Sequence, residues 1–162
     1  MNQSQPGFSL TDFGCGVGAY FDYLSARGHH VKYLGIDGTA AMVDTAREMH
    51  KDVDNCQFEE GWALTRETDY TVVSGTFNYK GETPFEQWQD FVLTALRNID
   101  QFSTKGFAFN LLTSYSDKEK MLSHLYYPSP SFYFDYCKSN FSKNIALLHD
   151  YGAYEFTVLV RK

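Results

Sequence analysis

The sequence predicts an α/β protein with a seven-stranded, mostly parallel sheet, an antiparallel last strand and helices on both faces. Three observations support this class. Strand-like and helix-like segments alternate along the chain, which is typical of parallel strands joined by crossover helices. A glycine-rich turn, GCGVGA at 14–19, joins the first strand to the first helix. The last two strand-like segments are separated by too few residues for a parallel crossover, which needs about a dozen.

The first segments alternate between strand-forming residues and helical periodicity. Apolar residues of strand-forming types indicate a strand over 7–13 (GFSLTDF). Apolar residues at helical spacing predict a helix over 19–27, and Gly28 stands where a helix C-cap is expected. A second strand over 30–37 (HVKYLGID) ends at Asp37.

The middle of the chain continues the alternation. A helix is predicted over 39–50, with Thr39 in the N-cap position. Two strands follow, CQFEE at 56–60 and DYTVVSG at 69–75. A helix is then predicted over 84–99, because its apolar residues recur on one side at helical spacing.

The last third contains one strand, one helix and a terminal pair of strands. KGFAFNLLT at 105–113 predicts the fifth strand, and SFYFDYCKSNF at 131–141 predicts a helix. Between them, the aromatic-rich segment 113–131 is expected to be a loop-like insert. The end of the chain, 144–162, predicts two strands joined by a tight turn around 150–153.

Composition limits the classes of function. A chain of 162 residues suits a single domain, and an aromatic content of 17% suggests that some rings line a pocket or an interface. The net charge of −6 disfavours nucleic acid, whose binders usually present a basic face. Three widely spaced cysteines fit neither a disulfide framework nor a zinc site, which favours a reducing cytoplasm. The sequence shows no metal-ligand spacing and no apolar run long enough for a membrane span.

The glycine-rich turn predicts a ligand site. A turn of this kind lets a ligand approach the backbone closely, and GCGVGA satisfies the dinucleotide pattern G-x-G-x-x-G/A. Asp37, at the end of the second strand, is able to hold ribose hydroxyls in more than one cofactor class. The alternative is a tight strand-to-helix turn without a ligand.

Asp12 discriminates between the cofactor classes. A carboxylate at the end of a central strand is costly to desolvate, and a pyrophosphate beside it would add repulsion. A ligand with an ammonium group would stabilise it. S-adenosylmethionine carries such a group on its amino acid tail, together with a ribose for Asp37. The alternative partner for Asp12 is a helix N-cap or a neighbouring loop.

DFGCGVG at 12–18, together with GIDGTAAM at 35–42, resembles the first two motifs of the class I S-adenosylmethionine-dependent methyltransferases. The terminal strand pair also matches the sixth and the antiparallel seventh strands of that family. The resemblance implies a Rossmann-like methyltransferase fold over residues 1–162. It also implies S-adenosylmethionine as cofactor, with S-adenosylhomocysteine as product.

The resemblance also implies site residues by position. Asp12 and the glycine turn would surround the methionine part of the cofactor, Asp37 the ribose, and Gly38 and Met42 the adenine. Trp62 stands where the family often has an acidic residue that contacts the adenine, so the resemblance does not say which residue makes that contact here. The full set of implied cofactor residues is Asp12, Gly14, Cys15, Gly16, Gly18, Asp37, Gly38, Met42, Gly61, Trp62, Ser74 and Phe77.

The acceptor side is less sharply defined. Phe77 and Tyr79 are candidates for cation–π contact with a sulfonium. Asn78, Tyr79 and Tyr115 are candidate substrate residues. The sequence names no catalytic base, and direct in-line transfer to a small-molecule acceptor is the expected reaction, because it depends chiefly on orientation.

Two other functions stay open at this point. One is an S-adenosylmethionine-binding module or fragment without catalysis, and the other is an NAD(P)-dependent oxidoreductase. The family normally has helices before the first strand, whereas only about seven residues precede it here. Either the chain is a fragment, or its pocket is unusually open, or a second copy or a partner chain completes the pocket.

Overall fold

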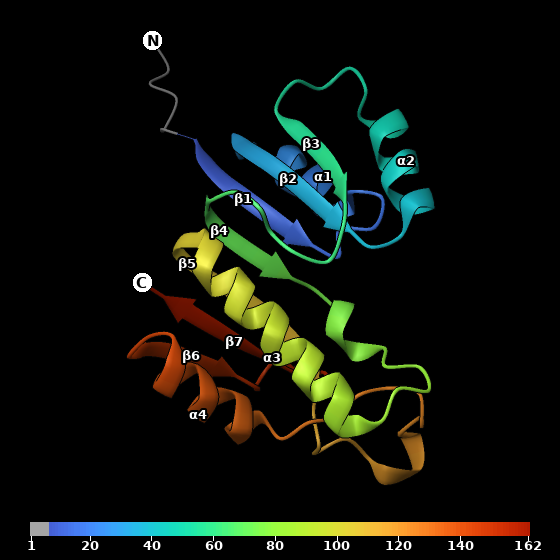
Figure 1. Cartoon of the computed structure of the whole chain (residues 1–162), viewed down its shortest axis with the longest axis vertical. Coiled ribbons are helices and arrows are strands. Elements are labelled where there is room, and N and C mark those ends of the chain that lie inside the picture. Colours follow the sequence, from blue (N-terminus) through green and yellow to red (C-terminus); the bar gives the residue numbers. More distant parts are fainter. Residues whose placement is uncertain (1–6) are drawn as a thin grey trace.

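The computed structural model describes residues 7–162, which form one seven-stranded sheet in the order β3-β2-β1-β4-β5-β7-β6 (Figure 1). The strands are β1 Phe8–Phe13, β2 Val31–Asp37, β3 Cys56–Glu60, β4 Thr68–Val73, β5 Ser103–Leu112, β6 Asn144–Leu148 and β7 Glu155–Arg161. The α-helices are α1 Ala19–Ala26, α2 Ala40–Met49, α3 Phe85–Phe102 and α4 Pro130–Asn140. Two short 3₁₀ helices are η1 Thr76–Asn78 and η2 Lys118–Lys120.

The predicted fold class is confirmed. The first five strands pair in parallel, and β7 lies antiparallel between β5 and β6. All the predicted helices are present, although α3 continues beyond 99 to Phe102. Thr39 occupies the N-cap position of α2, but its side chain makes no capping hydrogen bond. The expected lack of helices before the first strand concerns residues 1–6, which lie outside the described residues.

Two hydrophobic cores lie on opposite faces of the sheet. Helices α3 and α4 pack over β4, β5 and β7, around fully buried residues such as Leu96, Tyr133 and Phe156 (Figure 1). Helices α1 and α2 pack over β1, β2 and β3, around Phe21 and Val43. These crossover helices bring the carboxyl ends of β1, β2 and β4 to one edge, where open α/β sheets bind ligands.

The segment 113–131 is tied to the exit of β4. Tyr79 and Leu125 form an isolated antiparallel bridge, and the Tyr126 amide donates to the carbonyl of Asn78 at 2.9 Å. Tyr126 is fully buried, its hydroxyl lies 3.0 Å from that of Tyr133, and burial raises the pKa of Tyr126 to about 12. This tyrosine is therefore a core residue, although its segment lies at the ligand-binding edge.

None of the helices within residues 7–162 combines the length and the apolar character that a membrane span requires.

Candidate functional site

The glycine turn after β1 contains three glycines with positive φ, and only one of them faces open space. A Cβ on Gly14 (φ 80°) would lie 1.9 Å from Thr76 Oγ1, and a Cβ on Gly18 (φ 89°) would lie 2.9 Å from the Phe58 ring. A Cβ on Gly16 (φ 54°) would meet no atom within 4 Å. Gly14 and Gly18 are therefore required by internal packing, whereas Gly16 leaves its backbone open to a ligand.

Asp37 ties this turn to the next helix. Its Oδ2 accepts a hydrogen bond from the Gly16 amide at 2.9 Å, and its Oδ1 accepts one from the Thr39 amide at 2.9 Å. Its carbonyl accepts from the Gly61 amide at 2.9 Å. Each carboxylate oxygen has a second acceptor site, so two hydroxyls of a ligand still have partners at Asp37.

Asp12 lies on β1, only 4% exposed, below the turn. The Tyr33 hydroxyl of β2 donates to its Oδ2 at 2.5 Å, which is the one hydrogen bond to this side chain within residues 7–162. Burial raises the pKa of the Asp12 carboxyl to about 6, against the lowering effect of Tyr33 and with a further rise from Asp37. Tyr33 thus satisfies one oxygen of Asp12, and no cationic side chain within residues 7–162 pairs with the carboxylate.

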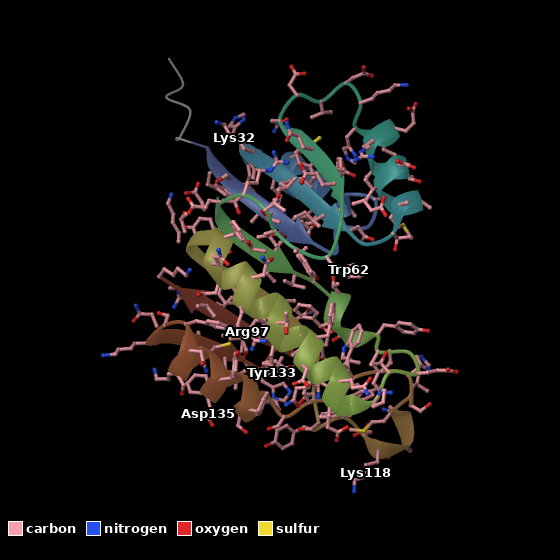
Figure 2. The ribbon with its side chains drawn as sticks, viewed as in Figure 1. Lys32, Trp62, Arg97, Lys118, Tyr133 and Asp135 are labelled. Atoms are coloured by element: carbon pink, nitrogen blue, oxygen red, sulfur yellow. The ribbon has the colours of Figure 1, made fainter. Side chains whose placement is uncertain are left out.

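The predicted adenine side is formed by Gly38 and Trp62. A Cβ on Gly38 would lie 1.9 Å from the Trp62 ring, so the indole lies directly across this glycine. Trp62 is 51% exposed and makes edge contacts with Phe13 and Phe91 at 6.2 and 5.9 Å between ring centroids. Figure 2 places it at the edge where β1 and β2 end. Met42 is also exposed.

Cys15 lies between Gly14 and Gly16 of the glycine turn. Its side chain is buried, and its sulfur lies 2.7 Å from where a Cβ on Gly35 would stand. Burial is the main cause that raises the pKa of the Cys15 thiol to about 12, so it stays protonated.

The predicted residues after β4 separate into core and surface. Phe77 is fully buried, with Phe13 and Phe91 at centroid distances of 6.0 and 6.3 Å. This structure therefore places the Phe77 ring in the core and away from any exposed sulfonium position. Ser74 is exposed at the end of β4.

The predicted substrate residues do not form one cluster of free side chains. The Asn78 side chain is held between the Leu112 amide and Glu155. Tyr79 is 64% exposed beside His124, and Tyr115 is 77% exposed beside His149.

Sequence reasoning missed Tyr33 and Glu155. Tyr33 reaches Asp12 because β1 and β2 pair in the register Asp12↔Gly35 and Leu10↔Tyr33, which puts the tyrosine diagonally beside the acid. Glu155 meets Asn78 across 77 positions of the sequence. The strand register brings Tyr33 to Asp12, whereas Glu155 meets Asn78 of η1, the 3₁₀ helix after β4, and no local motif signals either contact.

Comparisons with known proteins agree with this geometry. A family described as "Methyltransferase domain" matches residues 10–99. The "Putative methyltransferase Rv1506c" of Mycobacterium tuberculosis is 46% identical over 162 residues, which cover 100% of this chain and 97% of that protein.

Solved structures share the fold. Human N-acetylserotonin methyltransferase in complex with SAM superposes with a TM-score of 0.69 at 17% identity, covering 95% of this chain and 47% of the human chain. The "DhpI-SAM-HEP complex" superposes with a TM-score of 0.67 at 15% identity, covering 95% of this chain and 78% of that chain. With the two acids, the open glycine turn and the matched family domain taken together, the chain belongs to the class I S-adenosylmethionine-dependent methyltransferases.

Proposed function

We propose that the chain transfers the methyl group of S-adenosylmethionine to a small-molecule acceptor by direct in-line displacement. The observation that carries the proposal is the open backbone at Gly16 between the carboxylates of Asp12 and Asp37. This arrangement supplies a bare turn and two acids, which match a ligand with an ammonium group and a ribose.

The residues of the site fit the cofactor of this family. Asp12 has one carboxylate oxygen free of hydrogen bonds from residues 7–162, and it would accept from the ammonium. Asp37 would accept from the ribose hydroxyls, and Gly38, Met42 and Trp62 would flank the adenine. Bound S-adenosylmethionine supplies a methyl group that its sulfonium has already activated. The chain's own task is to hold and orient the reactants.

Two features support a small acceptor. The charge of −6 disfavours a nucleic acid. A hollow of about 220 Å³ opens beside the site, between Tyr20 of α1 and the ends of β4 and β5. Its size suits a small organic molecule better than a folded macromolecule.

The acceptor class is testable with S-adenosylmethionine labelled in its methyl group. The protein is incubated with cofactor and a cell extract, and the extract is then separated into small molecules, protein and nucleic acid. We expect the label in the small-molecule fraction. Label confined to protein or nucleic acid would contradict the proposal.

The in-line mechanism is testable with a chiral methyl group. A single displacement inverts the configuration at the methyl carbon, whereas two successive displacements through a protein nucleophile retain it. We expect inversion, since the Cys15 thiol beside the turn is buried and protonated.

We also propose that this single domain functions in the cytoplasm. All three cysteines are free thiols, which suits a reducing compartment.

Association with a second copy or with another chain would complete the open side of the pocket, and light scattering with and without cofactor tests this.

Cofactor affinity is expected to decrease as the pH falls, because the Asp12 carboxylate becomes protonated. Burial raises the pKa of the Asp12 carboxyl to about 6, and the ammonium binds the ionised form. Affinity is therefore full above that pKa and is lost as the pH falls through 6. Calorimetry should show binding about tenfold weaker at pH 5 than at pH 7. In Asp12→Asn, binding should be weak at both values and this step should vanish; a step of the same size in Asp12→Asn would assign it to another group.

Cofactor binding is expected to change the fluorescence of Trp62. This indole is 51% exposed across Gly38, whereas Trp88 is partly buried and donates to the Phe77 carbonyl at 2.8 Å. Titration with S-adenosylmethionine should quench the emission of the wild type and of Trp88→Phe. It should have little effect on Trp62→Phe. Equal quenching in Trp62→Phe would show that Trp62 does not lie beside the adenine.

A further inference from the structure

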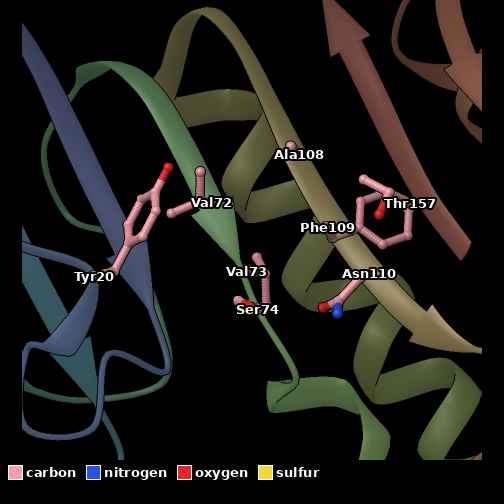
Figure 3. Close-up of a pocket in the computed structure, with 8 residues that line it drawn as sticks. All are labelled: Tyr20, Val72, Val73, Ser74, Ala108, Phe109, Asn110 and Thr157. Carbon is pink, nitrogen blue, oxygen red and sulfur yellow. The ribbon is translucent and has the colours of Figure 1, made fainter. Parts of the chain in front are cut away.

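A groove runs over the face of the sheet opposite α3, next to Asp12. The register places Asp12, Val72, Ala108 and Leu159 in one row across β1, β4, β5 and β7, so their side chains share this face. The groove is lined by Tyr20, Val72, Ser74, Ala108, Asn110 and Thr157 (Figure 3).

The two sides of the groove differ in chemistry. Tyr20 stands at one side in Figure 3, above the β1–β4 junction, and Asn110 and Thr157 stand at the other. Val72 and Ala108 form an apolar floor between them. The Tyr151 hydroxyl, from the turn before β7, lies 2.9 Å from Thr157 Oγ1. An apolar body thus fits the middle, with Asn110 and Thr157 at the β7 side and the Tyr20 hydroxyl at the other side.

Glu155 lies at the β7 side, two pairs along the β5–β7 ladder from Asn110 and Thr157 and therefore on the same face. The Asn110 side-chain amide donates to Glu155 Oε2 at 2.7 Å, and that of Asn78 donates to Oε1 at 3.2 Å. The side-chain oxygen and nitrogen of these two asparagines cannot exchange places. Asn110 Oδ1 already accepts from the Gly75 amide at 2.7 Å, and Asn78 Oδ1 accepts from the Leu112 amide at 2.9 Å.

Within residues 7–162 this network gives each carboxylate oxygen of Glu155 one amide donor. Glu155 therefore keeps a further acceptor site on each oxygen. Within residues 7–162 no Lys, Arg or His side chain forms an ion pair with it. The fold therefore positions a partly exposed negative charge beside an apolar groove, and no cation from residues 7–162 pairs with it.

We propose that Glu155 binds an ammonium group that anchors a cationic acceptor, whose apolar body lies in the groove over Val72 and Ala108 and whose methylated atom is a different one. The inference rests on the proposed function, because it names the substrate class of that same transferase. An ammonium supplies both the missing charge and N–H donors for the free acceptor sites. A neutral alcohol would leave the charge uncompensated, and a carboxylate would be repelled.

The test compares matched small molecules on the protein saturated with S-adenosylhomocysteine. The probes are 2-phenylethylamine, 2-phenylethanol and phenylacetate, and the measurement is NMR of the side-chain NH₂ groups. The amine should bind roughly tenfold more tightly than the alcohol and shift the signals of Asn110 and Asn78. Phenylacetate should be the weakest of the three. Equal affinity of amine and alcohol, or shifts confined to another surface, would overturn the inference.

Variants separate charge from structure. Glu155→Gln should abolish the preference for the amine, while Asp135→Asn, an exposed acid on α4, should retain it. Glutamine replaces one carboxylate oxygen by an NH₂ group that faces the NH₂ of one asparagine, so the folding of the variant is checked by its melting curve. The wild-type NMR comparison stands without the variant. Failure of the wild type to bind S-adenosylhomocysteine would count against the proposed function. Normal binding without an amine preference would overturn only the role of Glu155.

Discussion

Asp37→Ala is expected to weaken S-adenosylmethionine binding by about 100-fold. Hydrogen bonds to a charged acceptor contribute roughly 1.5–3 kcal/mol each, and each 1.4 kcal/mol is tenfold in affinity. The substitution removes the carboxylate expected to hold the ribose. It also removes the acceptor of the Gly16 and Thr39 amides, both at 2.9 Å, so the turn loses its connection to α2. Isothermal calorimetry below the melting temperature measures the effect.

The matched control is Asp44→Ala on α2. Asp44 is exposed and forms a surface pair with Arg47 at 3.3 Å, away from the glycine turn. Surface pairs of this kind contribute little, so affinity and stability should stay close to the wild type. Wild-type affinity in a folded Asp37→Ala protein would contradict the placement of the cofactor at this turn.

Phe77→Ala is expected to cost about 3–5 kcal/mol of unfolding free energy, the range for a large aromatic in a core. The ring is fully buried between Phe13 and Phe91, and its removal would leave a cavity under η1. For a chain of this size the melting temperature should fall by roughly 6–20 °C. Cofactor affinity, measured at a temperature where the variant is folded, should change far less.

Two variants make this result interpretable. Tyr115→Ala removes an aromatic ring that is 77% exposed, and stability should change by about 0.5 kcal/mol or less. Phe77→Leu keeps most of the volume and should recover much of the lost stability. If Phe77→Ala melted normally but bound the cofactor poorly, the ring would act at the sulfonium, as the sequence suggested, and not in the core.

The order of elements was predictable because local signals decide it. Period-two and period-3.6 patterns distinguish strands from helices, and the short turn before β7 excludes a parallel crossover. The glycine turn and the two acids were equally visible, since positive φ and strand-end carboxylates are local properties. Element ends were less certain, as the extension of α3 to Phe102 shows.

The roles of individual side chains were less predictable. Phe77 and Asn78 stand next to each other after β4, and the sequence assigns both to the ligand side. In the structure Phe77 fills the core, whereas the Asn78 side chain hydrogen-bonds to Glu155 and to the Leu112 amide. Which way each side chain points depends on the 3₁₀ turn η1 and on what α3 and β7 place against it.

The sequence by itself determined the alternation of strands and helices, the glycine bend and the acids on either side of it, because neighbouring residues encode these through backbone conformation and periodicity. Only the tertiary structure decided that Gly16 is the open one of the three turn glycines and that Tyr33 is the partner of Asp12. It also decided that Glu155 lies beside a groove with no ion-pair partner among residues 7–162. Those facts depend on contacts between residues far apart in the chain, and the register of the sheet, which no short stretch encodes, sets them.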